Sequence, residues 1–159
     1  MNSITPEIYR SALGNYATGI TVVTVRGRNG DPVGMTANSF ASVSLDPPLV
    51  LWSVDKSTPE AEDFQAASHY AIHVLKQDQQ KLSHTFANNS IDKFTDLSIE
   101  SGIANLPLLD DCSVWLQCEI VSRHDEGDHI ILVAQVLDAH IDSAEPLVYF
   151  DGGYRRLEP

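Results

Sequence analysis

Short extended segments follow one another along this chain with little more than turns between them, and this pattern constrains the fold more than any other feature. β-Branched residues dominate 20–25, and 49–54 is an almost continuous apolar run that predicts a central strand buried on both faces. Apolar and polar residues alternate in 112–120, and a turn at 125–128 separates this segment from 129–141, which predicts a hairpin. Few helices separate the strands, so we expect a mostly β (α+β) fold, an antiparallel barrel with a few peripheral helices.

Three helices are expected outside this barrel. The first begins at Pro6 with Thr5 as its N-cap. The second is expected to begin near Ser57, because Ser57 and Glu60 have the spacing of a capping box. The third covers 78–87, where apolar residues recur four positions apart.

The charge balance argues against a nucleic-acid partner. The chain has 159 residues, which fits one domain. It carries 22 Asp and Glu against 10 Lys and Arg, and its formal net charge is −12. A phosphate backbone is bound through an excess of Lys and Arg, so this surface would repel it. We expect a single domain over residues 1–159 that binds no nucleic acid.

Membrane insertion, secretion and disulfide formation also lack support. No run of ~18 apolar residues is present, and the first residues form neither a basic nor an apolar signal segment. Cys112 and Cys118 lie ~20 Å apart along one extended segment, beyond the reach of a disulfide. We therefore expect two core thiols in a cytoplasmic protein with no membrane partner.

Common catalytic and metal-binding motifs are absent. The sequence has no Gly-x-Gly-x-x-Gly, Walker-type, His-Glu-x-x-His or Gly-x-Ser-x-Gly segment. Its six histidines show no compact ligand spacing, so no metal site is expected.

Two polar segments stand out from apolar surroundings. Residues 34–40 (GMTANSF) place hydroxyl and amide groups beside backbone N–H groups, which can bind a phosphate or the edge of a heterocycle. A plain turn between two strands fits the same residues. Residues 55–58 (DKST) lie at the expected start of the second helix, where N–H groups, the helix dipole and Lys56 favour a phosphate. Ordinary helix capping is the alternative there.

Taken together, these and other segments resemble the flavin reductase family of FMN-binding split-barrel proteins. The similarity runs in order from about residue 10 to residue 156. The segments that carry it are 19–24 (GITVVT), 34–40 (GMTANSF), 42–49 (SVSLDPPL), 82–83 with 86–87, 92–94 (DKF), 127–129 (GDH) and 146–150 with 152–154. The loop 96–106 is less similar to the family pattern.

The resemblance implies an antiparallel split barrel, a homodimer with FMN near the subunit interface, and a set of site residues. Those expected along the isoalloxazine edge and ribityl chain are Thr36, Ala37, Asn38 and Ser39. Those expected at the ribityl phosphate are Ser53, Asp55, Ser57 and Thr58, next to Lys56. Lys93 and Phe94 would close over the cofactor, Tyr154 would also contact it, and His129 would lie beside the nicotinamide.

The resemblance implies an NAD(P)H-dependent flavin reductase that passes a hydride from NADH or NADPH to FMN and supplies reduced flavin to a partner monooxygenase. Such a protein needs no acid or nucleophile of its own, because the cofactor carries the chemistry. The alternative is a flavin carrier without useful reductase activity, since a protein of charge −12 does not attract anionic NAD(P)H. A third hypothesis is a protein-interaction module that does not bind FMN, in which each polar segment is only a turn.

Overall fold

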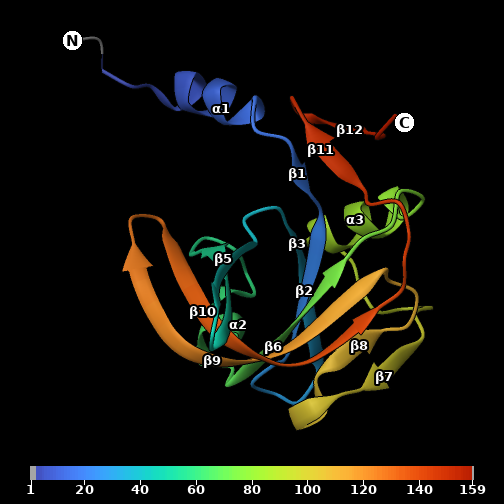
Figure 1. The fold of residues 1–159 in the computed structure, drawn as a ribbon. Helices are drawn as coiled ribbons and strands as arrows, with labels where there is room; N and C mark the ends of the chain where they lie inside the picture. Colours follow the sequence, from blue (N-terminus) through green and yellow to red (C-terminus); the bar gives the residue numbers. More distant parts are fainter. Residues whose placement is uncertain (1–2, 159) are drawn as a thin grey trace.

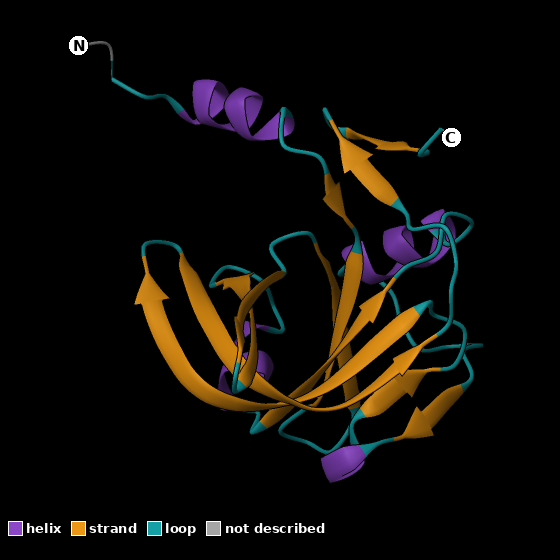
Figure 2. Ribbon diagram, viewed as in Figure 1, coloured by secondary structure: helices purple, strands orange, loops and turns teal. Residues whose placement is uncertain are grey.

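The computed structural model of the chain describes residues 3–158, and its centre is a curved antiparallel sheet of seven strands (Figures 1 and 2). From one edge to the other the strands are β3 (Pro32–Ala37), β2 (Thr21–Arg26), β6 (His69–Val74), β9 (Val114–Glu126), β10 (His129–Ile141), β5 (Pro48–Asp55) and β4 (Ala41–Leu45). Every neighbouring pair is antiparallel. The prediction of a mostly β, antiparallel fold is confirmed.

Smaller elements surround this sheet. Strands β1 (Thr18–Gly19), β11 (Val148–Phe150) and β12 (Gly153–Arg155) form a second sheet, and β7 (Ile99–Ser101) pairs with β8 (Pro107–Leu109) around the 3-10 helix η1 (Ile103–Asn105). The helices are α1 (Pro6–Gly14), α2 (Ala61–Ala66) and α3 (Gln80–Ala87). No helix within residues 3–158 has the length and apolar character needed to cross a bilayer.

The inside of the curved sheet forms the main apolar core. Trp52 has no exposed surface, and its ring packs edge-on against Phe64 of α2 at 4.9 Å and Tyr70 at 6.2 Å between ring centroids. Along β5 buried and half-buried residues alternate, and only β4 separates β5 from the sheet edge. The prediction of a central strand buried on both faces at 49–54 is therefore wrong. The outward side chains, Leu49 and Leu51 among them, are half-buried.

A second apolar cluster lies on the outside of the sheet beneath α3. Phe86 of α3 is fully buried there with Val22 and Leu75, and Leu147 joins them from the segment before β11. Both cysteines are free and buried, Cys112 in this cluster and Cys118 in the main core, so the expectation of core thiols is confirmed. Burial raises the pKa of each thiol to about 12.

The predicted start of the first helix is confirmed, whereas the predicted start of the second is wrong. The Thr5 side chain accepts a hydrogen bond from the Ile8 backbone N–H, as predicted for the cap of α1. The second helix, in contrast, begins at Ala61, and the predicted capping box is wrong. The Asp55 carboxylate accepts hydrogen bonds from both the backbone N–H and the hydroxyl of Ser57, which fixes a local turn in place of the first helical turn.

Candidate functional site

A pocket of about 250 Å³ lies where the end of β3 meets α3 and the C-terminal strands. We call it the β3–α3 pocket. Its lining residues are Ile20, Thr36, Ala37, Asn38, Ser83, Ala87, Tyr149 and Tyr154. The fold thus brings together four of the residues predicted to bind the cofactor. Three of them come from β3 and its end, and one comes from β12.

Hydrogen bonds from α3 fix two walls of this pocket. The Thr36 hydroxyl donates to the Ser83 carbonyl at 2.6 Å, and the hydroxyls of Ser83 and Tyr154 are 2.8 Å apart. The Tyr154 ring also packs edge-on against His84 and Tyr149. Ser83 was not predicted as a site residue, although it lies in one of the family-like segments, and no periodicity in the sequence marks it.

Strand β3 supplies backbone groups to the same pocket. It is the terminal strand of the large sheet, so the N–H and C=O groups along one of its sides have no strand partner. The Gly34 carbonyl points to this open side, because it accepts a hydrogen bond from the Lys93 ammonium at 3.0 Å. Residues two apart in a strand face the same way, so the backbone of Thr36 faces that side too. Asn38 has an exposed side chain.

A second group of predicted residues lies along the rim formed by β5 and β10. The Ser39 hydroxyl both accepts from the Ser53 N–H and donates to the Ser53 carbonyl, at 3.0 Å each, which ties the end of β3 to β5. Asp55 is the register partner of His129 at the start of β10. This rim and the β3–α3 pocket are joined by the segment between β3 and β4 (Figure 1).

His129 is held at this rim by its neighbour. Its Nδ1 lies 2.7 Å from the Asp128 carboxylate, and 42% of its side chain is exposed. This hydrogen bond lowers the pKa of Asp128, which keeps that carboxylate charged. His129 does not line the β3–α3 pocket, so one copy of the chain does not bring the two together.

Two of the residues predicted to bind a phosphate, Lys56 and Ser57, already have protein partners for their donors. The Lys56 ammonium is bonded to the Asp125 carboxylate and, at 2.7 Å, to the Gly127 carbonyl. Both Ser57 donors go to Asp55, and the hydrogen bonds from Ser57 lower the pKa of that carboxylate. A phosphate here would have to displace Asp55 from Ser57, and the helix start expected to attract it lies further along the chain at Ala61.

Lys93 and Phe94 lie further along β3, away from the β3–α3 pocket. The Lys93 side chain is 7% exposed, and its ammonium donates to Glu60 at 2.7 Å, to the Gly34 carbonyl and to Asn89. Phe94 packs edge-on against Phe86 at 5.1 Å. In this arrangement the pair holds the segment after α3 against β3.

The β3–α3 pocket suits the planar end of a flavin better than a whole nucleotide. Apolar walls, backbone groups of β3 and the Asn38 amide can hold a heterocycle by its edge. Its volume of about 250 Å³ lies below the ~300–1,000 Å³ typical of sites that enclose a small ligand, so part of the nucleotide would extend outside it. Within the described residues no three His, Cys, Asp or Glu side chains converge as metal ligands.

Comparison with known proteins decides the family. Residues 13–158 match the profile of the "Flavin reductase like domain". The chain belongs to the flavin reductase family. That match spans both the β3–α3 pocket and the β5–β10 rim, so the resemblance of the separate segments reflects membership of the family over nearly the whole chain.

Individual members of the family are similar over most of this chain. An FMN reductase (NADH), SmoA, of Agrobacterium fabrum is 45% identical over 94% of this chain and 84% of its own. The reductase component of a flavin-dependent trigonelline monooxygenase of Acinetobacter baylyi is 41% identical over 91% of this chain, which spans only 47% of that protein. Among solved structures, the NADH:FAD oxidoreductase SgcE6 of Streptomyces globisporus, in complex with NAD and FAD fragments, is 35% identical with a TM-score of 0.91 over 100% of this chain and 98% of its own.

Proposed function

We propose that this protein is an NAD(P)H-dependent flavin reductase that reduces FMN. The observation that carries the proposal is the β3–α3 pocket. This chain belongs to the flavin reductase family, and it places Thr36, Ala37, Asn38 and Tyr154 around that one cavity. When bound, the flavin would accept a hydride from the nicotinamide. The protein supplies no nucleophile for this step, and its work is to hold two rings within ~3–3.5 Å of each other.

The residues of the β3–α3 pocket have separate tasks in this proposal. The open side of β3 and the Asn38 amide bind the polar edge of the ring. The bonded trio of Thr36, Ser83 and Tyr154 keeps the pocket wall rigid, so that the flavin is held in one orientation. Ser39 and Ser53 connect this pocket to the rim where His129 would orient the nicotinamide.

We also propose that two copies of the chain form the working unit. Helix α1 has no buried residue, and Figure 1 shows it standing away from the large sheet. A helix of nine residues is only marginally stable alone in water, so its apolar side needs a partner surface. A second copy would also cover the open part of the flavin and could bring its own His129 toward the β3–α3 pocket.

The compartment and the oxygenase partner belong to the same proposal. Two buried thiols with a raised pKa suit a reducing compartment such as the cytoplasm. Some relatives are reductase components of monooxygenases, so we propose that reduced flavin is passed to such an enzyme. Residues 1–159 would act as one flavin reductase-like domain.

A flavin carrier without reductase activity is the second candidate, and the charge around His129 favours it. Asp55, Glu126 and Asp128 lie at the same rim, and an acidic rim slows the approach of anionic NAD(P)H. This charge affects the rate of association more than the affinity of the site, so the reductase stays the first candidate.

One experiment separates the candidates. Purified protein is mixed with NADH in air, and the nicotinamide absorbance is followed while FMN is added. We expect NADH oxidation that saturates with FMN. Flavin binding measured by fluorescence without NADH or NADPH oxidation would show a carrier, and the absence of both would show an interaction module.

A further inference from the structure

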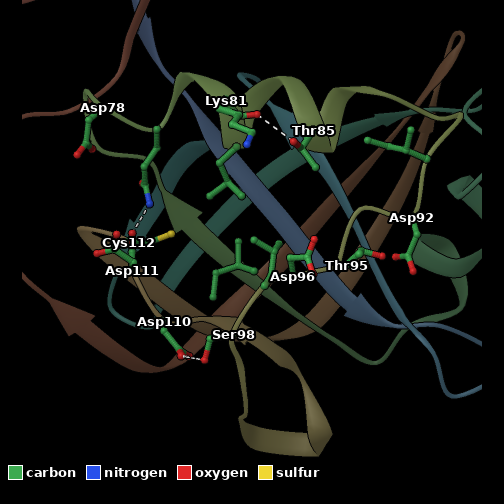
Figure 3. A pocket seen from close by; sticks show the side chains of 15 residues that line it. Asp78, Lys81, Thr85, Asp92, Thr95, Asp96, Ser98, Asp110, Asp111 and Cys112 are labelled. Carbon is green, nitrogen blue, oxygen red and sulfur yellow. Dashed lines mark hydrogen bonds between the residues drawn. The ribbon is translucent and has the colours of Figure 1, made fainter.

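A cavity of about 570 Å³ lies on the side of α3 that faces away from the β3–α3 pocket. It is bounded by α3, the segment 91–98 and the residues that follow β8 (Figure 3). We call it the Asp-rimmed cavity. Its volume falls within the ~300–1,000 Å³ of sites that bind small molecules, and it is more than twice as large as the β3–α3 pocket.

The floor of the Asp-rimmed cavity is apolar. It consists of Leu82, Ile91, Leu97, Leu109 and Cys112, of which all but Ile91 belong to or pack on the apolar cluster beneath α3. The Cys112 thiol adds no charge, because burial raises its pKa to about 12. A ligand that fits this floor has an apolar body, because covering the floor then removes apolar surface from water.

The rim carries the charge. The five carboxylates that line the cavity are those of Asp78, Asp92, Asp96, Asp110 and Asp111 (Figure 3). The ammonium of Lys81 also lines it, and that of Lys76 reaches Asp111 from beside it. Three of the five accept hydrogen bonds from the chain itself, Asp92 from the Phe94 N–H, Asp110 from Ser98 and Asp111 from Lys76. Among the described residues, Asp78 and Asp96 have no such partner, and both remain available to a bound cation.

This charge excludes the nucleotides of the proposed reaction. Flavin and nicotinamide nucleotides carry phosphates, and the rim repels them because it has three excess negative charges when both Lys81 and the Asp111-bonded Lys76 are counted. The same rim attracts a positive group, and the apolar floor selects among cations for those with a hydrophobic part. We propose that the Asp-rimmed cavity binds an organic ammonium ion with an aromatic or aliphatic body.

Helix α3 separates this site from the β3–α3 pocket. Ser83 and Ala87 line the β3–α3 pocket, whereas Lys81, Leu82 and Thr85 line the Asp-rimmed cavity. The site therefore belongs to residues that the proposed reduction does not use, and its ligand can be tested in the absence of flavin and NADH.

The test compares three probes of nearly equal size by isothermal titration calorimetry at low salt. They are phenylethylammonium, which has the apolar body and the charge, 2-phenylethanol, which is neutral, and phenylacetate, which is an anion. We expect phenylethylammonium to bind at millimolar or lower concentration, phenylethanol to bind more weakly, and phenylacetate not to bind. Saturation with FMN should leave binding of the ammonium unchanged, whatever the protein's reductase activity.

Two variants locate the site. Asp96→Asn should weaken phenylethylammonium about fivefold by removing one nearby charge, and Asn tolerates the positive φ of 63° at this position. Thr85→Phe should abolish binding by filling the cavity from α3. Asp31→Asn in the turn after β2 removes one charge elsewhere and is the matched control, which should bind as the parent does.

The proposal is overturned if phenylethylammonium shows no binding at millimolar concentration, or if phenylacetate binds equally well. Unchanged binding in Thr85→Phe would overturn it too, because the cation would then bind elsewhere. Circular dichroism of each variant confirms that it is folded before its titration is interpreted.

Discussion

At the scale of single residues, the structure gives Asp55 a role that its place in the sequence does not suggest. Its carboxylate takes both Ser57 donors and stands opposite His129 in the β5–β10 register. Hydrogen bonds from the Ser57 backbone and side chain lower its pKa, so it is charged at neutral pH. A phosphate that approaches Ser57 therefore meets a competitor for the same donors and a like charge.

We expect Asp55→Ala to tighten FMN more than riboflavin. The change frees two Ser57 donors and removes a negative charge, so FMN affinity should rise roughly fivefold to tenfold if the phosphate binds there. Fluorescence titrations of both flavins measure the two affinities. Weaker binding of both would show that Asp55 itself is a ligand, and equal tightening would show that the phosphate lies elsewhere.

His129 is the residue assigned to the nicotinamide. His129→Ala should leave FMN affinity nearly unchanged and slow the reduction of bound flavin by NADH on the order of 100-fold, because the hydride donor is no longer held in place. Stopped-flow single-turnover reduction measures this rate, and thermal unfolding on the same preparation checks stability. A lower melting temperature with an unchanged reduction rate would make His129 a structural residue.

His73 carries the clearest pH dependence of folding. It is fully buried, its Nδ1–H donates to the Val22 carbonyl, and its Nε2 accepts from the Leu109 N–H, both at 3.1 Å. Burial lowers its pKa from 6.5 to about 4. In this pH range the unfolded chain binds the proton more readily than the folded one, so protonation favours unfolding.

The free energy of unfolding should therefore fall by about 3 kcal/mol from this residue as the pH drops from 6.5 to about 4, at ~1.4 kcal/mol per pH unit. Below pH 4 both states are protonated, and His73 contributes no further change. Urea unfolding of the parent and of His73→Asn between pH 4 and 7 tests this, because only the parent should lose this contribution. Parallel curves for the two proteins would contradict it.

At the scale of elements, the packing of α3 on β3 determines the shape of the candidate site. Gly34 makes this close approach possible, since a Cβ at this position would lie 2.6 Å from the Phe86 ring and 3.2 Å from Phe94. The Lys93 ammonium, bonded to the Gly34 carbonyl and to Glu60, holds the segment after α3 against the same strand. The helix in turn positions Ser83 beside Thr36 and Tyr154.

Gly34→Ala should consequently push α3 from β3. We expect a loss of stability of about 1–3 kcal/mol from overpacking, together with weaker FMN binding because Ser83 shifts. Chemical unfolding and flavin fluorescence measure the two effects. Gly19→Ala in β1 is the control, since a Cβ there meets nothing within 4 Å. A Gly34→Ala protein as stable as the control would show that the rings have room to move.

At the scale of the whole molecule, α1 has an apolar side that the single chain does not cover. Ile8, Tyr9 and Leu13 lie on one side of the helix, and each is at least half exposed. Ser11 lies on the opposite side from Tyr9 and Leu13, about 200° around the helix axis from each at ~100° per residue.

Leu13→Asp should convert the proposed dimer into a monomer, because it places a charge in the contact surface. Ser11→Asp, on the polar side of the same helix, should stay dimeric. Light scattering after gel filtration gives the mass of each, and flavin titrations show whether the monomer binds FMN less tightly. A parent protein that is already a monomer at micromolar concentration, or a Leu13→Asp dimer, would contradict the proposed interface.

Local sequence patterns were enough to predict several of the strands and helices of this protein. Period-two alternation and a turn at 125–128 predicted the β9–β10 hairpin, and Thr5 with Pro6 predicted the start of α1. Each of these depends on residues close in the sequence. Residues 34–40 are also one of the segments that resemble the family. They include the end of β3 and polar groups that line the candidate site.

Only the tertiary structure determined the features that depend on contacts between residues far apart in the sequence. Sequence predicted a helix at Ser57, but the Asp55 carboxylate binds the donors of Ser57 and the helix begins at Ala61. The resemblance placed Lys93 at the cofactor, and only the fold showed that its ammonium also binds Glu60 and the Gly34 carbonyl. The run 49–54 is apolar on both faces, yet only one face meets the core, because which side of a strand is buried depends on the neighbours that the fold gives it.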